Sequence, residues 1–428
     1  MFKVKFFTVG CKVNQYDTQL LREQVLSCAD FKEVNDFLPA DIYIINTCTV
    51  THKADTDSFY LIRKVKKENP RAKVVVTGCL AELEEDVKRI RDVERIDLIV
   101  KNRDKFKIPF LLNSFISNSS FIHSSCRGIS YFKSHTRAFL KVQEGCDNFC
   151  SYCKVPRVRG RSRSKNPQDI LEEFKRLIKN GYKEIVLCGV CLGSYGKDIE
   201  PSLELIDLLV ILDNLGGDFR IRLSSIEAWD ITERFIQNID KIKKLCPHLH
   251  IPIQSGDRDI IFLMNRPIDP TGYLEIIQRL RERIPSLVIT TDVMVGFPQE
   301  KEKNFLNTVE IIRKIRPLKV HIFSFSARKD TAAYFLKEKI PSWQIRNRVA
   351  FLKKLTAEIS FEVKKSFLGK TGSVLFEQEI KESTNRWWYG LSEHYLKVKV
   401  NSFEELKNRF KKTELCSLDE GYIIGVVQ

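Results

Sequence analysis

Repeated strand–helix units constrain the fold of this 428-residue chain more than any other feature. From Ala138 onward, six apolar runs alternate with segments whose apolar residues recur at helical spacing. The runs span residues 138–143, 184–190, 219–225, 248–254, 287–295 and 319–326. Units of this length predict parallel strands covered by helices, and six units rather than eight predict a partial (β/α)6 barrel that is open on one side. Because active groups in such folds lie at the carboxyl ends of the strands, we expect the site in the loops that follow these runs.

The first run leads into a loop that contains Cys146, Cys150 and Cys153. Structural zinc sites normally use four ligands, whereas an iron–sulfur cluster held by three thiolates leaves one iron free to bind another group. Spacing alone leaves two alternatives open, a zinc site completed by a distant ligand and three unligated thiols. The position of the loop after the first barrel strand favours a cluster in a catalytic site.

Glycines and polar residues stand at the ends of the other predicted strands. Gly189 opens a glycine-containing loop, Ser225 ends the third run and Gln254 ends the fourth. Glycine lets the backbone approach a ligand closely, and polar side chains at a barrel mouth need hydrogen-bond partners, which a polar cofactor or neighbouring loops would supply. Cys188 and Cys191 form a C-x-x-C motif, but the position of Cys188 inside the strand argues against a metal or redox role.

The first hundred residues predict an open parallel α/β sheet, in which three strands end alike. Each of three apolar runs leads directly to a cysteine, namely Cys11, Cys48 or Cys79. Parallel strands place their carboxyl ends on one edge of the sheet, so these cysteines should converge. Simple burial of thiols in the core is the alternative, but it does not explain three repeats at one topological position. We therefore predict a second three-thiolate site, and a packing role for Cys28.

The chain divides into an N-terminal domain (1–104), a linker (105–133), a barrel domain (134–362) and a C-terminal domain (363–428). The linker is polar, and we expect it on the surface, with Cys126 unligated. Short strands at 373–377, 387–391, 395–400 and 421–427 predict a small β-barrel. In it, Lys397 and Lys399 should share one face, and the aromatic residues of 386–389 either stack on bases or pack in the core. Cys416 looks structural.

The charge of the chain favours a polyanionic partner. Its 71 Lys and Arg against 55 Asp and Glu give a net charge of +16, which favours nucleic acid over general solubility. A basic run beside the cysteine loop supplies candidate phosphate contacts, although a solvated face is the usual reading of such a run. These candidates are Arg157, Arg159, Arg161 and Arg163. Neither a secretory signal nor a run of membrane-spanning length is visible, so the 12 cysteines predict reduced thiols in a cytoplasmic protein.

The loop 146–153, with Tyr152 before its last cysteine, resembles the radical S-adenosylmethionine (SAM) superfamily. Residues 144–153 and the set Cys11, Cys48 and Cys79 resemble its methylthiotransferase branch. Segments 10–17, 46–51 and 189–196 are similar to the group that modifies threonylcarbamoyladenosine in tRNA, and the C-terminal segment resembles the TRAM domain, an RNA-binding module. The resemblance covers essentially the whole chain.

The resemblance implies an enzyme that adds a methylthio group to the threonylcarbamoyladenosine next to the anticodon. It implies two 4Fe-4S clusters: one on Cys146, Cys150 and Cys153 that binds SAM for radical cleavage, and an auxiliary one on the N-terminal cysteines. The SAM pocket would include Tyr152, Gly189, Ser225 and Gln254. An electron donor such as a flavodoxin or ferredoxin and a sulfur donor would take part, and no membrane would. The alternatives are relatives that act on a ribosomal protein or on isopentenyladenosine in tRNA, and a non-catalytic iron–sulfur RNA-binding protein.

The chain departs from the family pattern at a few positions. Cys188 and Cys191 stand where Thr and His are expected, Gln299 stands where Gly is usual, and segment 327–331 lacks a usual Gly. None of these positions belongs to the six proposed cysteine ligands.

Overall fold

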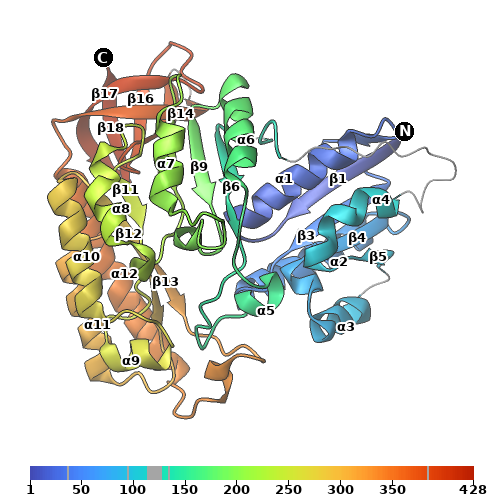
Figure 1. Ribbon diagram of the computed structural model, residues 1–428, viewed down its shortest axis with the longest axis horizontal. Coiled ribbons are helices and arrows are strands. Elements are labelled where there is room, and N and C mark those ends of the chain that lie inside the picture. The colour runs from blue at the N-terminus through green and yellow to red at the C-terminus, as the bar shows by residue number, and fades with distance from the viewer. Residues whose placement is uncertain (36–37, 94–95, 113–127, 134, 383–384) are drawn as a thin grey trace.

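Three β structures organise the computed structural model, which describes residues 1–428 except 36–37, 94–95, 113–127, 134 and 383–384. They are an N-terminal parallel sheet, a central set of six parallel strands with helices, and a closed C-terminal barrel. In Figure 1 the N-terminal sheet lies beside the central strands, and the C-terminal barrel covers the far end of those strands. The α/β architecture predicted from the sequence is confirmed.

The N-terminal sheet has five parallel strands in the order β2-β1-β3-β4-β5. The strands are β1 (Phe2–Thr8), β2 (Phe31–Glu33), β3 (Ile42–Thr47), β4 (Lys73–Gly78) and β5 (Leu98–Ile99). Helices α1 (Lys12–Leu26), α2 (His52–Glu68) and α3 (Glu84–Val93) connect them. Every residue of β3 is buried, as its uninterrupted apolar run requires for the central strand of a covered sheet.

The segment predicted as a linker is in part ordered structure. Residues 102–111 form η2 (Asn102–Lys107) and α4 (Ile108–Leu111), and Ile108 and Leu112 are fully buried in the core of the N-terminal sheet. Farther along, Ile129 and Phe132 are buried in the core of the central domain rather than lying on a surface. Cys126 and the serine-rich stretch fall within 113–127, outside the described residues.

All six predicted barrel strands are present. They are β6 (Arg137–Lys141), β9 (Glu184–Cys188), β10 (Arg220–Leu223), β11 (His248–His250), β12 (Val288–Val295) and β13 (Lys319–Ser324). They form two three-stranded parallel sheets, which bridges between Ile221 and Leu245 and between Ser225 and His250 join into one curved wall. The short strands β7 (Gln143–Glu144) and β8 (Arg163–Ser164) pair beside the cysteine loop.

Helices cover the outer face of this wall, as the helical spacing predicted. They are α6 (Pro167–Lys179), α7 (Leu205–Asp213), α8 (Glu233–Asn238), α10 (Pro270–Arg283), α11 (Glu302–Ile315) and α12 (Ser342–Lys365). The short helix α9 (Arg258–Leu263) instead buries Ile260 and Ile261 in a small cluster with Phe297, against which Tyr152 of the cysteine loop packs. Helix α1 of the N-terminal sheet also packs beside β6 and buries Val13, Tyr16 and Leu20 in the central core. Side chains of this size contribute roughly 1.5–3 kcal/mol each when fully buried, so α1 joins the two units firmly.

The C-terminal barrel closes in the order β14-β15-β16-β18-β17. Its strands are β14 (Thr371–Glu382), β15 (Asn385–Ser392), β16 (Lys397–Asn401), β17 (Phe410–Asp419) and β18 (Tyr422–Val427). The valines of β16 are buried and Lys397 and Lys399 face outward, as predicted. Trp388 is in the core. The charged sequence of β17 gave no strand signal, although that strand closes the barrel.

Buried charges attach this barrel to the central wall. Arg220 donates hydrogen bonds to the carbonyl oxygens of Ser373 (3.0 Å) and Leu391 (2.8 Å) in the barrel. Arg222 donates to further barrel carbonyls, at 3.0 and 3.1 Å. Both guanidinium groups pair with Glu184 of β9, a fully buried carboxylate whose pKa their charges lower despite its burial. The two arginines thus anchor the barrel, with Glu184 and the barrel carbonyls together satisfying their guanidinium groups.

Candidate active site

The three cysteines after β6 form one group at the mouth of the central strands. Cys146, Cys150 and Cys153 are all partly exposed. The Sγ atom of Cys146 accepts a backbone hydrogen bond from Asn148 and that of Cys153 accepts one from Val155, each at 3.4 Å. Burial and the nearby thiols of Cys150 and Cys146 raise the pKa of Cys153 to about 12. Without a bound cation, therefore, these thiols oppose one another's ionisation.

A fourth thiol, that of Cys191, lies in hydrogen-bond contact with Cys146. Its Sγ atom accepts from Asn148 Nδ2 at 3.3 Å and donates to Asp230 Oδ2 at 3.3 Å. The hydrogen bond to Cys146 and burial both raise the pKa of Cys191, which keeps it a thiol. The sequence analysis argued against a metal or redox role for Cys191. The pairing of β9 with β6 is what brings Cys191 next to Cys146.

A buried arginine and a glutamate lie beside the cysteine loop. Arg266 donates to Glu227 Oε2 at 2.7 Å and to the carbonyl oxygen of Pro252 at 2.9 Å. It also contacts the thiol of Cys150 and the hydroxyl of Tyr152, the latter at 3.4 Å. Tyr152 thus lies against Arg266 at the edge of the three-cysteine group. Arg266 follows α9 and carries no sequence signal, and Glu227 lies two residues beyond the end of the predicted third strand.

The predicted SAM-pocket residues lie at successive strand ends with different surroundings. Ser225 is exposed just beyond β10. Gln254 is partly exposed and has a φ of +68°, a left-handed conformation that costs a non-glycine residue energy and clusters at functional sites. Gly189 packs closely against Gln143, because a Cβ atom there would lie 2.9 Å from Gln143 Oε1. The glycine at 189 therefore allows close approach of another part of this chain.

The three N-terminal cysteines converge at the carboxyl edge of their sheet. Cys11 precedes α1 and is exposed, whereas Cys48 and Cys79 are buried after β3 and β4. The thiols of Cys48 and Cys79 share a hydrogen bond, and that bond together with the charge of Arg159 lowers the pKa of Cys79 to about 6. Cys48 Sγ also accepts from the backbone of Val50 at 3.5 Å. Three thiols at one edge, with a backbone donor and a cation beside them, suit a three-thiolate cluster.

The four arginines of the basic run take two different positions. Arg157, Arg161 and Arg163 are exposed. They line a cavity of about 720 Å³ together with Arg103 and Lys105 of η2. Arg159 contributes to the same wall, but its side chain is only 2% exposed. The guanidinium of Arg159 is held by Glu144 Oε1 at 2.5 Å, by Asp17 Oδ2 at 3.4 Å and by Asn14 Oδ1. Burial and these partners distinguish it from the three exposed arginines.

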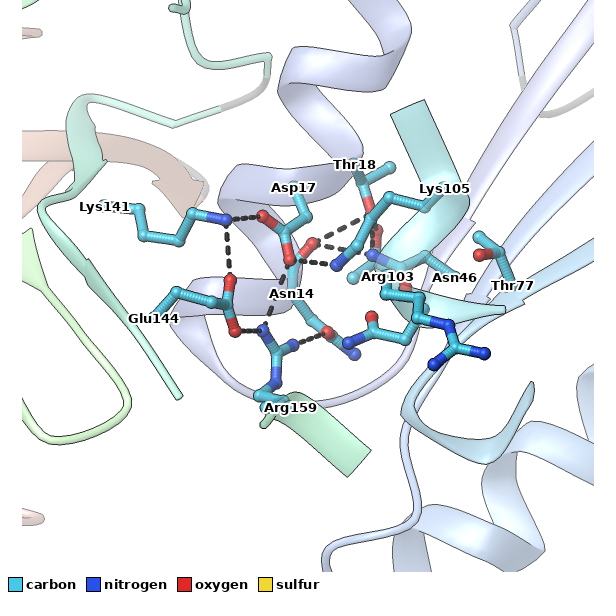
Figure 2. Close-up of polar contacts among 12 residues, drawn as sticks. Asn14, Asp17, Thr18, Asn46, Thr77, Arg103, Lys105, Lys141, Glu144 and Arg159 are labelled. Carbon is cyan, nitrogen blue, oxygen red and sulfur yellow. Dashed lines mark hydrogen bonds and ion pairs between the residues drawn. The ribbon is translucent and has the colours of Figure 1, made fainter. Parts of the chain in front are cut away.

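Arg159 belongs to a buried ion network, which we define as Asp17, Lys105, Lys141, Glu144 and Arg159. Figure 2 shows the five side chains pointing toward one another across the contact between α1, η2 and the central domain. Lys105 pairs with Asp17 at 2.5 Å, and Lys141 pairs with Asp17 and, at 2.8 Å, with Glu144. The network therefore fixes the N-terminal sheet against the cysteine loop.

A second polar group lines the inner face of the last three barrel strands. Ligand atoms of His250, Asp292 and His321 all lie within 4.8 Å of one another. His250 Nε2 is 3.2 Å from Asp292 Oδ1, and its Nδ1 is 2.9 Å from the hydroxyl of Thr290. Burial lowers the pKa of His321, as does the charge of Lys319. These side chains offer polar contacts to a ligand within the barrel.

Two departures from the expected glycines occur where the backbone is left-handed. Gln299 has a φ of +70°, and Asp330, within the segment that lacks its usual Gly, has a φ of +71°. Glycine adopts this conformation without steric cost. The left-handed backbone that favours glycine is therefore kept at positions 299 and 330, although neither residue is glycine.

Comparison with known proteins identifies the family. A model described as the radical SAM superfamily matches residues 140–312, and one described as uncharacterized protein family UPF0004 matches residues 3–101. The chain is 35% identical to the threonylcarbamoyladenosine tRNA methylthiotransferase MtaB of Thermotoga maritima, over 99% of this chain and 97% of that protein. The chain belongs to the radical SAM tRNA methylthiotransferases. The MtaB of Bacillus subtilis is 32% identical to this methylthiotransferase over 100% of the chain and 98% of the relative.

Other relatives of this methylthiotransferase are named for a different modified nucleoside. The tRNA-2-methylthio-N(6)-dimethylallyladenosine synthase of Clostridium tetani is 34% identical, over 89% of this chain and 86% of that protein. Among solved structures, the radical SAM methyltransferase TsrM of Kitasatospora setae matches with a TM-score of 0.54 and 10% identity, over 78% of this chain and 77% of that one. This similarity supports the radical SAM fold of the chain.

Family membership makes this chain an enzyme that uses SAM and 4Fe-4S clusters as cofactors and tRNA as substrate. In the described part of this methylthiotransferase, no helix combines the length and the apolar character needed to cross a membrane.

Proposed function

We propose that this enzyme methylthiolates the adenine ring of threonylcarbamoyladenosine next to the anticodon of tRNA. The observation that carries methylthiolation is the pairing of two three-thiol sets in one chain, one at the barrel mouth and one at the sheet edge. The names of the relatives from Thermotoga maritima and Bacillus subtilis support this substrate. A tRNA substrate also supports a cytoplasmic location.

The chain's own residues would bind and orient the cofactors. The thiolates of Cys146, Cys150 and Cys153 would hold one cluster and leave one iron for SAM, and Cys11, Cys48 and Cys79 would hold the second. When bound, SAM and the two clusters supply the radical, the sulfur and the methyl group. Tyr152, Gly189, Ser225 and Gln254 would form part of the SAM pocket, with the partly exposed Gln254 and the exposed Ser225 offering polar groups. A flavodoxin or ferredoxin would deliver electrons, and a separate donor would renew the sulfur.

The exposed arginines of the cavity would contact tRNA phosphates. Arg157 is tied to Asp330, whose carbonyl oxygen lies 2.9 Å from Nη1, and Arg161 pairs with Asp147 at 3.2 Å. Arg163 is exposed beside them at the start of β8. Such contacts fix the position of RNA without reading its sequence. The cavity adjoins both the cysteine loop and η2, so RNA bound there lies close to the site.

The test is the nucleoside profile of tRNA from cells that lack the gene, measured by mass spectrometry and complemented with wild type or with Cys146→Ala. We expect the methylthio-threonylcarbamoyladenosine peak to disappear, to return with wild type, and to stay absent with the variant. An unchanged profile in the deletion strain would overturn the proposal.

The second candidate substrate is isopentenyladenosine in tRNA, which the name of the Clostridium tetani relative favours. The same measurement separates the two, because each substrate gives a methylthio derivative of different mass. Loss of the isopentenyl derivative alone would replace the first proposal by the second.

A further inference from the structure

The buried ion network beside Cys79 contains more positive than negative charge. Lys105, Lys141 and Arg159 are cations, whereas Asp17 and Glu144 are its only carboxylates, which leaves one positive charge unmatched. The side chains of Asp17, Lys105 and Arg159 are between 0% and 4% exposed, so water does little to stabilise that charge. A buried charge without a partner costs several kcal/mol. An anion is therefore expected next to the network.

The thiol of Cys79 lies in the right place to supply that negative charge. Helix α5 (Val155–Arg159) packs against η1 (Cys79–Ala81), and Arg159 donates to Asn14 Oδ1, while Asn14 Nδ2 donates to the carbonyl oxygen of Thr47, next to Cys48, at 2.9 Å. Lys105 belongs to η2, which also packs against η1. The network thus faces two of the three cysteines at the sheet edge.

The unmatched charge fits the group that three thiolates would hold. A four-iron cluster core of charge +2 bound by three thiolates carries a net charge of about −1, and this becomes about −2 on one-electron reduction. A single buried positive charge balances the oxidised form and favours uptake of a further electron. Net charge and hydrogen bonds to the ligand sulfurs are known to set the reduction potentials of such clusters.

We propose that Arg159, within this buried network, is a positioning residue for the auxiliary cluster: it supplies, beside the turn that carries Cys79, the buried charge that sets the cluster's reduction potential. This inference rests on the proposed ligation by Cys11, Cys48 and Cys79. It assigns Arg159 a role different from that of Arg157, Arg161 and Arg163. It also gives a reason for burying five charges at this contact, because apolar residues would serve stability equally well.

The sign of the effect depends on which member of the network is changed. Arg159→Gln removes one positive charge, so it should make the auxiliary cluster harder to reduce. Asp17→Asn removes a negative charge from the same network, so it should make the cluster easier to reduce. A role limited to packing does not predict opposite signs.

The experiment is an anaerobic redox titration followed by electron paramagnetic resonance. The full chain carries Cys146→Ser, Cys150→Ser and Cys153→Ser, so that the auxiliary cluster alone gives the signal. In this background we expect about four irons per chain. At the midpoint of the background protein, Arg159→Gln should lower the ratio of reduced to oxidised cluster at least tenfold, which corresponds to about 59 mV for a one-electron couple. Asp17→Asn should raise that ratio.

Arg161→Gln is the matched control, because Arg161 is 77% exposed in the same basic run. Its potential should match that of the background protein. If Arg159→Gln yields no folded, iron-loaded protein, Lys105→Met replaces it, since this change also removes one positive charge. Equal potentials in the charge-removing variant and the control, or shifts of the same sign in the variants of Arg159 and Asp17, would overturn the inference. A background protein that binds no iron would instead refute the proposed auxiliary site.

Discussion

Removing the carboxylate of Asp17 should destabilise the contact between the N-terminal sheet and the central domain. Asp17 is fully buried and faces Lys105 at 2.5 Å, Arg159 at 3.4 Å and Lys141. In Asp17→Asn, Glu144 alone would compensate three buried cations. Breaking a buried ion pair in this way costs about 3–5 kcal/mol. At about 2.1 cal/mol/K per residue, a chain of this size loses roughly 3–6 °C in its melting temperature.

The assay is thermal unfolding of the variant and of two comparison proteins. Asp57→Asn removes an exposed pair with Lys53 (3.7 Å, side chains 47% and 86% exposed) and should change the melting temperature by about 1 °C or less. The double variant Asp17→Asn with Lys105→Met removes one charge of each sign, so it should recover most of the loss. A shift in Asp17→Asn no larger than in Asp57→Asn, or a double variant as unstable as the sum of both single changes, would refute this reasoning.

Three further predictions concern other parts of the chain. In iron-free protein, the oxidant diamide should join the thiols of Cys146 and Cys191 in a disulfide that peptide mass mapping identifies; Cys191→Ser should abolish this cross-link and Cys188→Ser should not. Arg163→Gln should weaken tRNA binding and reduce the slope of log affinity against log salt by about 0.9, whereas an unchanged slope would remove Arg163 from the RNA contact. Burial alone raises the pKa of Glu144, but Lys141 and Arg159 hold it at about 2, below its ordinary value of 4.5. Glu144 therefore contributes about 3 kcal/mol above pH 4.5, which is lost as the pH falls toward 2, and Glu144→Gln should flatten this part of the stability profile in urea unfolding.

The features that follow from local sequence patterns were predictable. The six barrel strands are apolar runs of β-forming residues, and each of them is a strand in the structure. The convergence of Cys11, Cys48 and Cys79 also followed, because parallel strands share one carboxyl edge. Alternation of valine and lysine correctly placed Lys397 and Lys399 on the outside of the C-terminal barrel. In each of these cases a single rule of chain geometry is enough to predict the position of the residues.

Contacts between distant segments were not predictable in the same way. Arg159 belongs to the same basic run as the exposed arginines, so the local sequence does not distinguish it from them. Its burial depends on Asp17, a partner that lies 142 positions earlier in the chain. The contact of Cys191 with Cys146 depends on the pairing of β9 with β6 and on the path of the loop between them. Strand β17 belongs to the barrel because the barrel must close, and its own charged sequence carries no apolar period.

The attachment of the C-terminal barrel through Arg220 and Arg222 has a consequence for how an RNA would be chosen. Four hydrogen bonds run from two buried side chains to backbone carbonyls, and backbone positions do not change with rotamers. An RNA held by the barrel would therefore be presented to the thiol sites at a constant span. A tRNA would then be accepted when the distance between the region bound by the barrel and the target adenine equals that span. The enzyme would therefore select substrates by this distance as well as by the chemistry of the base.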